Sequence, residues 1–316
     1  MQSKESIQQG LEELKRKYGD WTFDIPLPFD IWTNGNLQIP QTRLKRIVQV
    51  VKDLSEKPLS DCRILDLGCL DGIFSIEFAQ QGAATIGVEI REANIQKAIF
   101  CKDVLELHNL DFRQDDVRNI SLESYGRFDA IICSGILYHL PAADAIKLIK
   151  TMFEMVDRVV VIDTHVSLAS DTRFSFQGDE YWGSTYQEYP EDYPPDAIAK
   201  NLWASANNPT SFWFTRPSLV NLLNKAGFSS IYECFVPVHF IPADMNFERS
   251  GIAFQDRCTF VALKGAPCNV TTSPITNDIQ QAWPEHSLSY APPAKTLDDH
   301  VPLHKRLLSR LRGARA

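Results

Sequence analysis

The segment over residues 63–72 constrains the fold of this 316-residue chain more than any other. A short apolar strand carries Asp66 near its end and leads to Gly68 and Gly72, which stand four residues apart. A helical stretch follows, and a second strand over 84–89 ends in an acid. A strand, a glycine turn, a helix and a second strand with a terminal acid form the first half of a nucleoside-binding βαβ unit.

The spacing within this turn indicates which nucleoside it binds. A dinucleotide loop has the pattern G-x-G-x-x-G, because the pyrophosphate must lie on a helix N-terminus. Here the pattern is Asp-x-Gly-x-x-x-Gly, and Leu70 stands where a middle glycine would be. Asp66 would repel a pyrophosphate and attract the ammonium group of a methionine moiety, which favours S-adenosyl-L-methionine as cofactor. Gly68 and Gly72 would let the backbone approach this cofactor, with Cys69 and Leu70 in the same loop.

Two further acids extend the predicted cofactor site. Glu89 at the end of the second strand, with Ile90 beside it, is expected to accept hydrogen bonds from both ribose hydroxyls. An acid at this place serves NAD equally well. After the third strand, Asp116 is expected to accept a hydrogen bond from the adenine amino group while Val117 packs on the ring. Asp115 is the competing candidate, and a solvated loop acid is the alternative.

The remaining pattern predicts the whole sheet. Residues 128–134 form a continuous apolar run, which is typical of a parallel strand covered on both faces, and they lead to cofactor contacts at Ser134 and Gly135. Further helices and strands are expected over 142–156, 158–163, 217–226, 230–236 and 257–263. We therefore predict an α/β fold: a Rossmann-like, seven-stranded, mostly parallel sheet with helices on both faces and a closing antiparallel strand pair.

With these features in register, residues 61–265 resemble a class I S-adenosylmethionine-dependent methyltransferase domain. The resemblance implies a transferase that catalyses methylation. Two segments are similar to a narrower group around the bacterial tRNA wobble-uridine methyl- and carboxymethyltransferases. Uncharacterised small-molecule and sugar methyltransferases share the same segments. They are Gly-Ile-Leu-Tyr-His over 135–139, and Thr-Ser-Phe-Trp-Phe-Thr-Arg-Pro-Ser over 210–218 leading to Ala-Gly-Phe over 226–228.

One departure from that group favours the ordinary cofactor. The carboxymethyl branch carries a basic residue before the core, which pairs with the extra carboxylate of its modified cofactor. The corresponding residues 25–32 contain no Lys or Arg. This difference weakens the tRNA interpretation and supports S-adenosylmethionine.

The charge distribution also disfavours a nucleic acid partner. The net charge is −8, and residues 301–316 contain five basic residues and no acid, so the other residues carry −13. Phosphate neutralisation supplies most non-specific affinity for a polyanion, so an acidic body suits a small-molecule methyl acceptor better than tRNA. The seven cysteines form no Cys-x-x-Cys pair. We expect no metal site and a reducing, cytoplasmic location, without a transmembrane segment or signal peptide.

Three regions surround or interrupt the predicted core. Residues 1–60 are expected to form a helical cap. Residues 166–214, rich in aromatic and acidic side chains, are expected to form a lid that recognises the substrate. A lid or homodimer contact with packed aromatics is the alternative. Residues 266–316 indicate a flexible Pro-rich linker and a basic tail that could touch an anionic surface.

The candidate catalytic residues follow the fourth and fifth strands, because the acceptor lies beyond their carboxyl ends in this fold. His139 is the first candidate for a general base, since its ordinary pKa lies near neutral pH, although a histidine there also serves as a structural hydrogen-bonding group. Asp163 and His165 stand two apart on an extended chain and point to one side, so they could form a carboxylate–imidazole pair. The candidates for substrate contact are Tyr138, Tyr181, Trp182 and Trp213.

The sequence thus favours an S-adenosylmethionine-dependent methyltransferase that acts on an oxygen or nitrogen atom of a small molecule, such as a sugar-containing or secondary metabolite. A tRNA wobble-uridine methyl- or carboxymethyltransferase is the first alternative. A non-catalytic scaffold protein that binds S-adenosylmethionine is the second.

Overall fold

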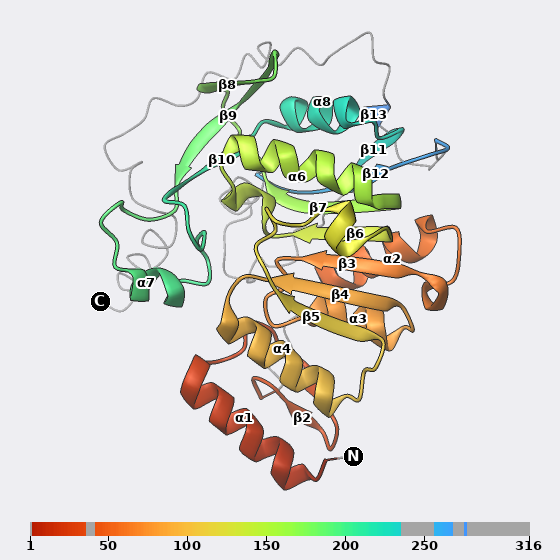
Figure 1. Ribbon diagram of the computed structural model, residues 1–316, viewed down its shortest axis with the longest axis vertical. Helices are drawn as coiled ribbons and strands as arrows, with labels where there is room; N and C mark the ends of the chain where they lie inside the picture. The colour runs from red at the N-terminus through yellow and green to blue at the C-terminus, as the bar shows by residue number, and fades with distance from the viewer. Residues whose placement is uncertain (1, 36–41, 235–255, 268–274, 277–316) are drawn as a thin grey trace, which may run out of the picture.

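The computed structural model describes residues 2–35, 42–234, 256–267 and 275–276 (Figure 1). The basic tail and almost all of the predicted linker over 266–316 lie outside these residues, as do residues 235–236 of one predicted strand. Within the described residues, no helix is both long and apolar enough to cross a membrane.

The predicted central sheet is present. Its strands lie in the order β13-β11-β12-β7-β6-β3-β4-β5. The strands from β3 to β7 pair in parallel, whereas β12 pairs antiparallel with both β7 and β11. The seven expected strands are confirmed, and the two-residue β13 adds an edge. Their bounds are β3 (Arg63–Leu67), β4 (Ala84–Glu89), β5 (Leu110–Gln114), β6 (Phe128–Ser134), β7 (Val156–His165), β11 (Ser230–Cys234), β12 (Arg257–Leu263) and β13 (Ile275–Thr276).

Helices cover both faces of this sheet because its strands are apolar on both sides (Figure 1). On β6, Ile131 packs with α6 and α8, whereas the adjacent Ile132 packs into a second core with α2, α3 and α4. The bounds are α1 (Lys4–Tyr18), α2 (Thr42–Leu54), α3 (Ile73–Gln80), α4 (Glu92–Val104), α5 (Leu122–Tyr125), α6 (Ala142–Met155), α7 (Pro195–Lys200) and α8 (Arg216–Ala226), with short 3-10 helices η1 (Leu59–Asp61) and η2 (Leu137–His139).

Local signals in the sequence set the ends of α8. The Thr215 side chain accepts a hydrogen bond from the Ser218 backbone N–H, which caps the first turn, and Pro217 follows at its start. Gly227 ends the helix in the left-handed conformation, with φ of 111°. The predicted helix is therefore confirmed to within a residue.

The N-terminal segment is fastened to the core beneath the glycine turn. Helix α1 packs on α4, and α2 packs on α3 and β7. Between the two helices, the backbone N–H groups of Thr22 and Phe23 donate to the buried Asp71 carboxylate. Buried Lys97 donates to the Asp20 carbonyl at 2.6 Å. A short hairpin of β1 (Pro26–Leu27) and β2 (Ile31–Trp32) follows.

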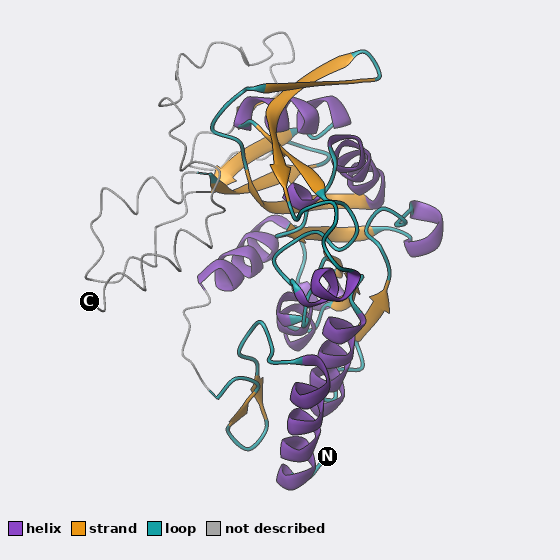
Figure 2. Cartoon of the chain, turned by 90° about the vertical axis from the view of Figure 1, so that its left-hand side faces the viewer, coloured by secondary structure: helices purple, strands orange, loops and turns teal. Residues whose placement is uncertain are grey.

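The insert between β7 and α8 is built on a sheet of its own. Strands β8 (Thr172–Phe176), β9 (Asp179–Gln187) and β10 (Thr210–Phe214) pair antiparallel in the order β10-β9-β8. Helix α7 lies in the connection from β9 to β10, to one side of the three strands (Figures 1 and 2). Phe212 and Phe214 point into the core beside α6 and α8. The aromatic richness of this region therefore serves packing as well as the cavity described next.

Candidate functional site

A cavity lies at the carboxyl ends of the parallel strands. The loops after β3, β4, β5 and β6 all line it, which is the edge where ligands bind in open α/β sheets. Strand β3 sits between β4 and β6, so the order of the strands reverses there. Of the predicted cofactor contacts, those lining the cavity are Gly68, Cys69, Leu70, Glu89, Ile90, Asp116, Val117, Ser134 and Gly135.

The loop after β3 is held in shape by Glu89. Gly68 has a φ of 65°, and a Cβ there would lie 3.1 Å from the side chain of Ile136. The Leu70 N–H donates to Glu89 Oε2 at 3.1 Å, and the Arg91 N–H donates to Oε1 at 2.8 Å. Burial raises the pKa of Glu89, against the effect of these backbone donors. Each carboxylate oxygen retains a lone pair for a ligand hydroxyl.

Asp66 and Gly72 lie beneath this loop, outside the lining of the cavity. Asp66 is buried and accepts a hydrogen bond from Ser75 Oγ at 2.6 Å, and its burial raises its pKa to about 7. Gly72 has a φ of 88°, and a Cβ there would lie 2.6 Å from the ring of Phe112. A glycine is needed at this position so that the turn can pack closely against β5, and not, as expected, so that the backbone can approach the cofactor.

Both acids after β5 line the cavity. Asp116 accepts from Arg118 Nε at 3.0 Å and from Asn207 Nδ2 at 3.1 Å. Burial acts to raise its pKa, but these donors outweigh burial and the pKa is lowered. Asp115 accepts from the Tyr125 hydroxyl at 2.7 Å, and its pKa is also lowered against the effect of burial. The structure brings both candidates for adenine recognition to one wall.

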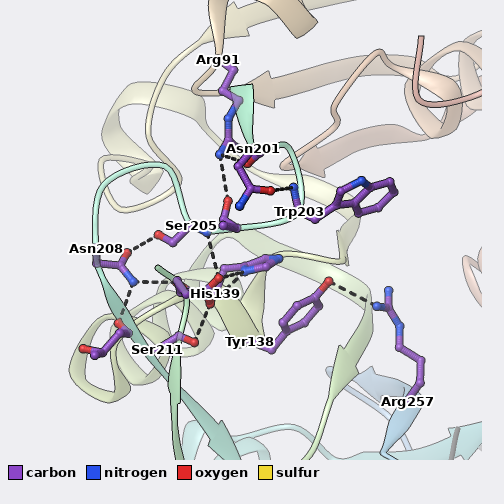
Figure 3. Close-up of polar contacts among 12 residues, drawn as sticks. Arg91, Tyr138, His139, Asn201, Trp203, Ser205, Asn208, Ser211 and Arg257 are labelled. Atoms are coloured by element: carbon purple, nitrogen blue, oxygen red, sulfur yellow. Dashed lines mark hydrogen bonds and ion pairs between the residues drawn. The ribbon is translucent and has the colours of Figure 1, made fainter. Parts of the chain in front are cut away.

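His139 is paired with an acid of the insert that the sequence analysis did not single out. Its Nδ1 lies 3.0 Å from both carboxylate oxygens of Glu188. The Glu188 side chain is 1% exposed, and it also accepts from the Ser205 N–H at 3.0 Å and from Ser211 Oγ at 2.6 Å. Figure 3 marks these hydrogen bonds around His139. The sequence signal for Glu188 was only the acidic, aromatic composition of the insert.

The expected pair of Asp163 and His165 is not formed, and that prediction was wrong. Asp163 accepts from Arg257 Nε and from Thr259 Oγ1, each at 2.7 Å. His165 Nδ1 lies 3.1 Å from Asp256 Oδ2 instead. The reason is the antiparallel pairing of β12 with β7, which places Thr259 opposite Asp163 and brings Asp256, just before β12, close to His165. Neither partner lies within β7, so no pattern in that strand alone contains them.

The predicted substrate residues divide into two groups. Tyr138 lines the cavity, and its ring lies edge-on to His165 and to Trp213. Trp213 stacks between Tyr186 and His165, with ring centroids 4.7 Å and 4.9 Å apart. We call the rings of Tyr138, His165, Tyr186 and Trp213 the aromatic platform. Tyr181, by contrast, is buried in the core beside Phe214.

Trp182 likewise lies outside the lining of the cavity; its backbone N–H donates to Ser218 Oγ at 2.6 Å. Successive side chains of a strand point to opposite faces, so not every aromatic residue of the insert can face the cavity. Tyr138 therefore lines the cavity, and Trp213 lies outside the lining in contact with the Tyr138 ring, whereas Tyr181 and Trp182 have structural positions.

Residues 201–208, here named the strap, cross the cavity. Leu202 and Asn207 are among its lining residues. Arg91 Nη2 donates to the carbonyls of Asn201, at 3.0 Å, and Ala204, at 2.8 Å. Asn208 Nδ2 donates to the His139 carbonyl at 3.0 Å (Figure 3). The strap is thus tied both to Arg91, at the start of α4, and to the candidate base.

The residues around the cavity suit a nucleoside cofactor. Apolar side chains such as Val117 and Ile136 line one part, and Glu89 and Asp116 offer acceptors. The Ser134 hydroxyl is buried at the cavity without a hydrogen-bond partner among the described residues. Such an unpaired polar group is costly unless a ligand satisfies it. In the described part of the chain, no cluster of His, Cys, Asp and Glu has the arrangement of a metal site.

Comparison with known proteins agrees with this geometry. Residues 40–233 match a family described as a methyltransferase domain. The chain belongs to this methyltransferase family. It therefore carries the domain of an S-adenosylmethionine-dependent methyltransferase, and S-adenosylmethionine is its cofactor. This family match does not confirm the resemblance to the tRNA wobble-uridine group.

Individual relatives cover only part of the chain. It is 30% identical over 95 residues to the ubiquinone biosynthesis O-methyltransferase of Acinetobacter baylyi, which is 30% of this chain and 40% of the relative. It is 35% identical over 89 residues to the corresponding enzyme of Azotobacter vinelandii, which is 26% of this chain and 35% of the relative. The match thus spans less than half of either relative.

A solved structure resembles more of the chain. The N-terminal domain of EvdMO1, crystallised in the presence of S-adenosylhomocysteine and D-fucose, has a TM-score of 0.60 and 23% sequence identity. The similarity covers 84% of this chain and 98% of that one, and it shows the shared fold.

Proposed function

We propose that this methyltransferase moves a methyl group from S-adenosylmethionine to a hydroxyl oxygen of a small, ring-containing molecule. The observation that carries the proposal is the pairing of His139 with the buried Glu188 at the cavity. A hydroxyl is a poor nucleophile until its proton is removed, so an oriented base favours an oxygen acceptor over an amine that is already deprotonated.

The roles of the two residues follow from their geometry. A carboxylate can only accept, so Nδ1 of His139 donates to Glu188. The other ring nitrogen, Nε2, is then the atom that can take the acceptor's proton. Glu188 acts as a positioning residue: it fixes the imidazole, and Ser205 and Ser211 hold the carboxylate in turn. When bound, the cofactor supplies the electrophilic methyl group on its sulfonium.

The walls of the cavity support a ring-containing acceptor. Of the aromatic platform, Tyr138 lines the cavity next to His139, whereas Trp213 is stacked between Tyr186 and His165. Aromatic faces stack on flat rings and on the apolar faces of sugars. The partial relatives are named as O-methyltransferases of ubiquinone biosynthesis, and EvdMO1 was crystallised in the presence of a sugar. Both observations favour a phenol or a sugar-containing metabolite.

The test begins with a panel of phenols and sugars, incubated with S-adenosylmethionine and the protein, with S-adenosylhomocysteine and methylated product measured by mass spectrometry. We expect His139→Asn to reduce turnover by a factor of roughly 10² to 10⁴, while the affinity for S-adenosylhomocysteine stays the same. His108→Asn is the matched control, because that histidine is exposed and outside the cavity lining.

Three results would contradict the proposal. If the His139→Asn variant turns over as fast as wild type, His139 is not the general base. Methylation of unmodified tRNA in preference to every small molecule would favour the wobble-uridine alternative. Tight cofactor binding without turnover on either class of acceptor would favour a scaffold protein.

A further inference from the structure

Arg91, at the start of α4, has no role in the chemistry described above, although its side chain borders the cavity. Among the described residues, the hydrogen bonds of its guanidinium group all go to the strap: Nη2 donates to the carbonyls of Asn201 and Ala204, and the buried Nε has no partner. Burial lowers the pKa of Arg91, and the nearby Glu89 and Glu188 act against burial. A partly buried cation therefore lies near the acid of the cofactor site and the acid that holds the base, yet its side chain is bonded to the strap.

The strap carries this contact to the acid beside the base. The Ala204 carbonyl and the Ser205 N–H belong to one peptide group, which is planar, so that its C=O and N–H point in opposite directions. Arg91 holds the oxygen of this group at 2.8 Å, and the N–H donates to Glu188 Oε2 at 3.0 Å. The same Oε2 lies 3.0 Å from Nδ1 of His139. When Arg91 fixes the carbonyl, it therefore also fixes the direction of the N–H that holds Glu188.

These groups form a continuous chain of hydrogen bonds from the guanidinium through the peptide and the carboxylate to the imidazole (Figure 3). A cation on the carbonyl oxygen polarises the peptide and makes its N–H a stronger donor, since hydrogen bonds in a chain strengthen one another. The Glu188 side chain is 1% exposed, so water does not replace a donor that it loses. The arginine can therefore act on the partner of the base without a direct hydrogen bond to it.

A second set of contacts holds the two ends of this chain. Asn208 Nδ2 donates to the His139 carbonyl at 3.0 Å, and the Ser205 hydroxyl donates to Asn208 Oδ1 at 2.5 Å. Arg91 is fixed from the cofactor side, because its backbone N–H donates to Oε1 of Glu89 at 2.8 Å. The peptide group of the strap is therefore held from both sides.

We propose that Arg91 is a positioning residue for the methyl transfer. By holding the peptide group after Ala204, it keeps Glu188 on Nδ1 of His139 and so leaves Nε2 to take the proton of the acceptor. Arg91 acts through the strap and touches neither the acceptor nor the imidazole. This inference rests on the proposed function and adds the residue that holds the partner of the base in place.

The first measurement does not depend on turnover. The tautomer of His139 is read by long-range proton–nitrogen NMR of protein saturated with S-adenosylhomocysteine, at a pH at which this imidazole is neutral, and the His139→Asn spectrum assigns its signals. In wild type we expect the proton on Nδ1. Arg91→Met keeps the apolar stem without the charge or the donors, and it should lose at least roughly half of that form. Arg91→Lys should keep most of it, since one ammonium nitrogen can replace Nη2 in both bonds.

The second measurement is a double-mutant cycle in kcat, at saturating S-adenosylmethionine and acceptor. Arg91→Met alone should lower kcat at least roughly tenfold. In a Glu188→Gln background the same change should lower kcat less than about threefold, because the carboxylate through which Arg91 acts is already gone. A change that only loosened the fold would lower kcat by the same factor in both backgrounds. If Arg91→Met does not fold, Arg91→Gln, which can keep one of the two bonds, takes its place in both measurements.

Arg63→Met is the matched control. Arg63, at the start of β3, also holds a loop by two backbone carbonyls: its Nη1 donates to the Arg127 carbonyl at 2.7 Å, and its Nη2 to the Tyr125 carbonyl at 2.8 Å. It lies at the amino end of its strand, outside the cavity lining. The variant should leave the His139 tautomer and kcat as in wild type, whatever its effect on stability.

Each contrary result overturns the inference in its own way. If Arg91→Met has the wild-type tautomer, the arginine does not position the imidazole. If the losses of kcat multiply in the double variant, Arg91 acts by a route other than Glu188. If Arg63→Met changes the tautomer as Arg91→Met does, the change reflects a general loosening of the fold. If wild type methylates no acceptor while the tautomer changes as expected, the proposed function fails and the orientation of His139 by Arg91 stands.

Discussion

Replacing Asp66 by Asn tests how the acid beneath the glycine turn contributes to stability. Asp66 is buried, and its burial raises its pKa from an ordinary value of 3.8 to about 7. Asn keeps the size of the side chain and an oxygen for the Ser75 hydroxyl, but it cannot ionise. A pKa raised on folding adds stability below the unfolded value, and that stability is lost as the pH rises through the folded value.

The magnitude follows from the shift. A difference of about three pKa units corresponds to roughly 4 kcal/mol of unfolding free energy across the whole range. Between about pH 5 and about pH 8.5, wild type should lose about 3 kcal/mol through this group, and Asp66→Asn should not. The variant's advantage over wild type should therefore grow by about 3 kcal/mol over that range.

The assay is urea unfolding of the cofactor-free protein at both pH values, with Asp111→Asn, an exposed acid on the edge strand β5, as control. An equal difference between Asp66→Asn and wild type at both pH values would refute the reasoning. The same variant tests the predicted pairing of Asp66 with the cofactor's ammonium. If that pairing exists, binding of S-adenosylmethionine at about pH 6 should release a proton from wild type but not from the variant, as calorimetry in two buffers detects.

Three other changes have defined outcomes. Gly68→Ala should lower affinity for S-adenosylhomocysteine at least roughly tenfold in calorimetry, whereas Gly178→Ala, also at a positive φ but with open space around it, should leave the affinity unchanged. Arg91→Ala should speed amide hydrogen exchange selectively in the strap, and Arg113→Ala, a partly exposed arginine on β5 outside the cavity lining, should not. Unchanged exchange of the strap in Arg91→Ala would show that Arg91 does not hold the strap in place. Asp163→Asn should destabilise the fold by about 3 kcal/mol in urea unfolding at neutral pH, because Arg257 loses its carboxylate partner. As the pH falls through the pKa of Asp163, which the neighbouring guanidinium groups lower against the effect of burial, the carboxylate of wild type is protonated too, and the difference in stability between variant and wild type should disappear.

The parts of the fold and the site that could be predicted are those encoded locally. The strand ending near Asp66, the glycine turn and Glu89 lie within one βαβ unit, so their mutual placement follows from backbone geometry alone. The helix ends at Thr215 and Gly227 are equally local. For this reason the strands and the helices agree with the prediction, and most residues predicted to bind the cofactor line the cavity.

The rest depends on contacts that no local pattern contains. Glu188 reaches His139 across 49 positions of sequence, and Arg257 reaches Asp163 across 94. The register between β12 and β7 decides that Thr259 lies opposite Asp163. A single sequence does not state that register, so proximity along the chain wrongly suggested Asp163 as the partner of His165 and gave no partner for His139.

The insert supplies more than a cover for the cavity. Through Glu188 it holds the imidazole of His139, and through Asn207 it contacts the acid expected to read adenine. In the proposed function, one segment therefore contributes Tyr186 and Trp213 to the aromatic platform and also orients the candidate base. An exchange of this segment between related enzymes, intended to transfer specificity, would also exchange the partner of the base. New acceptors are then most readily gained by changes at the aromatic platform, with Glu188, Ser205 and Ser211 kept in place.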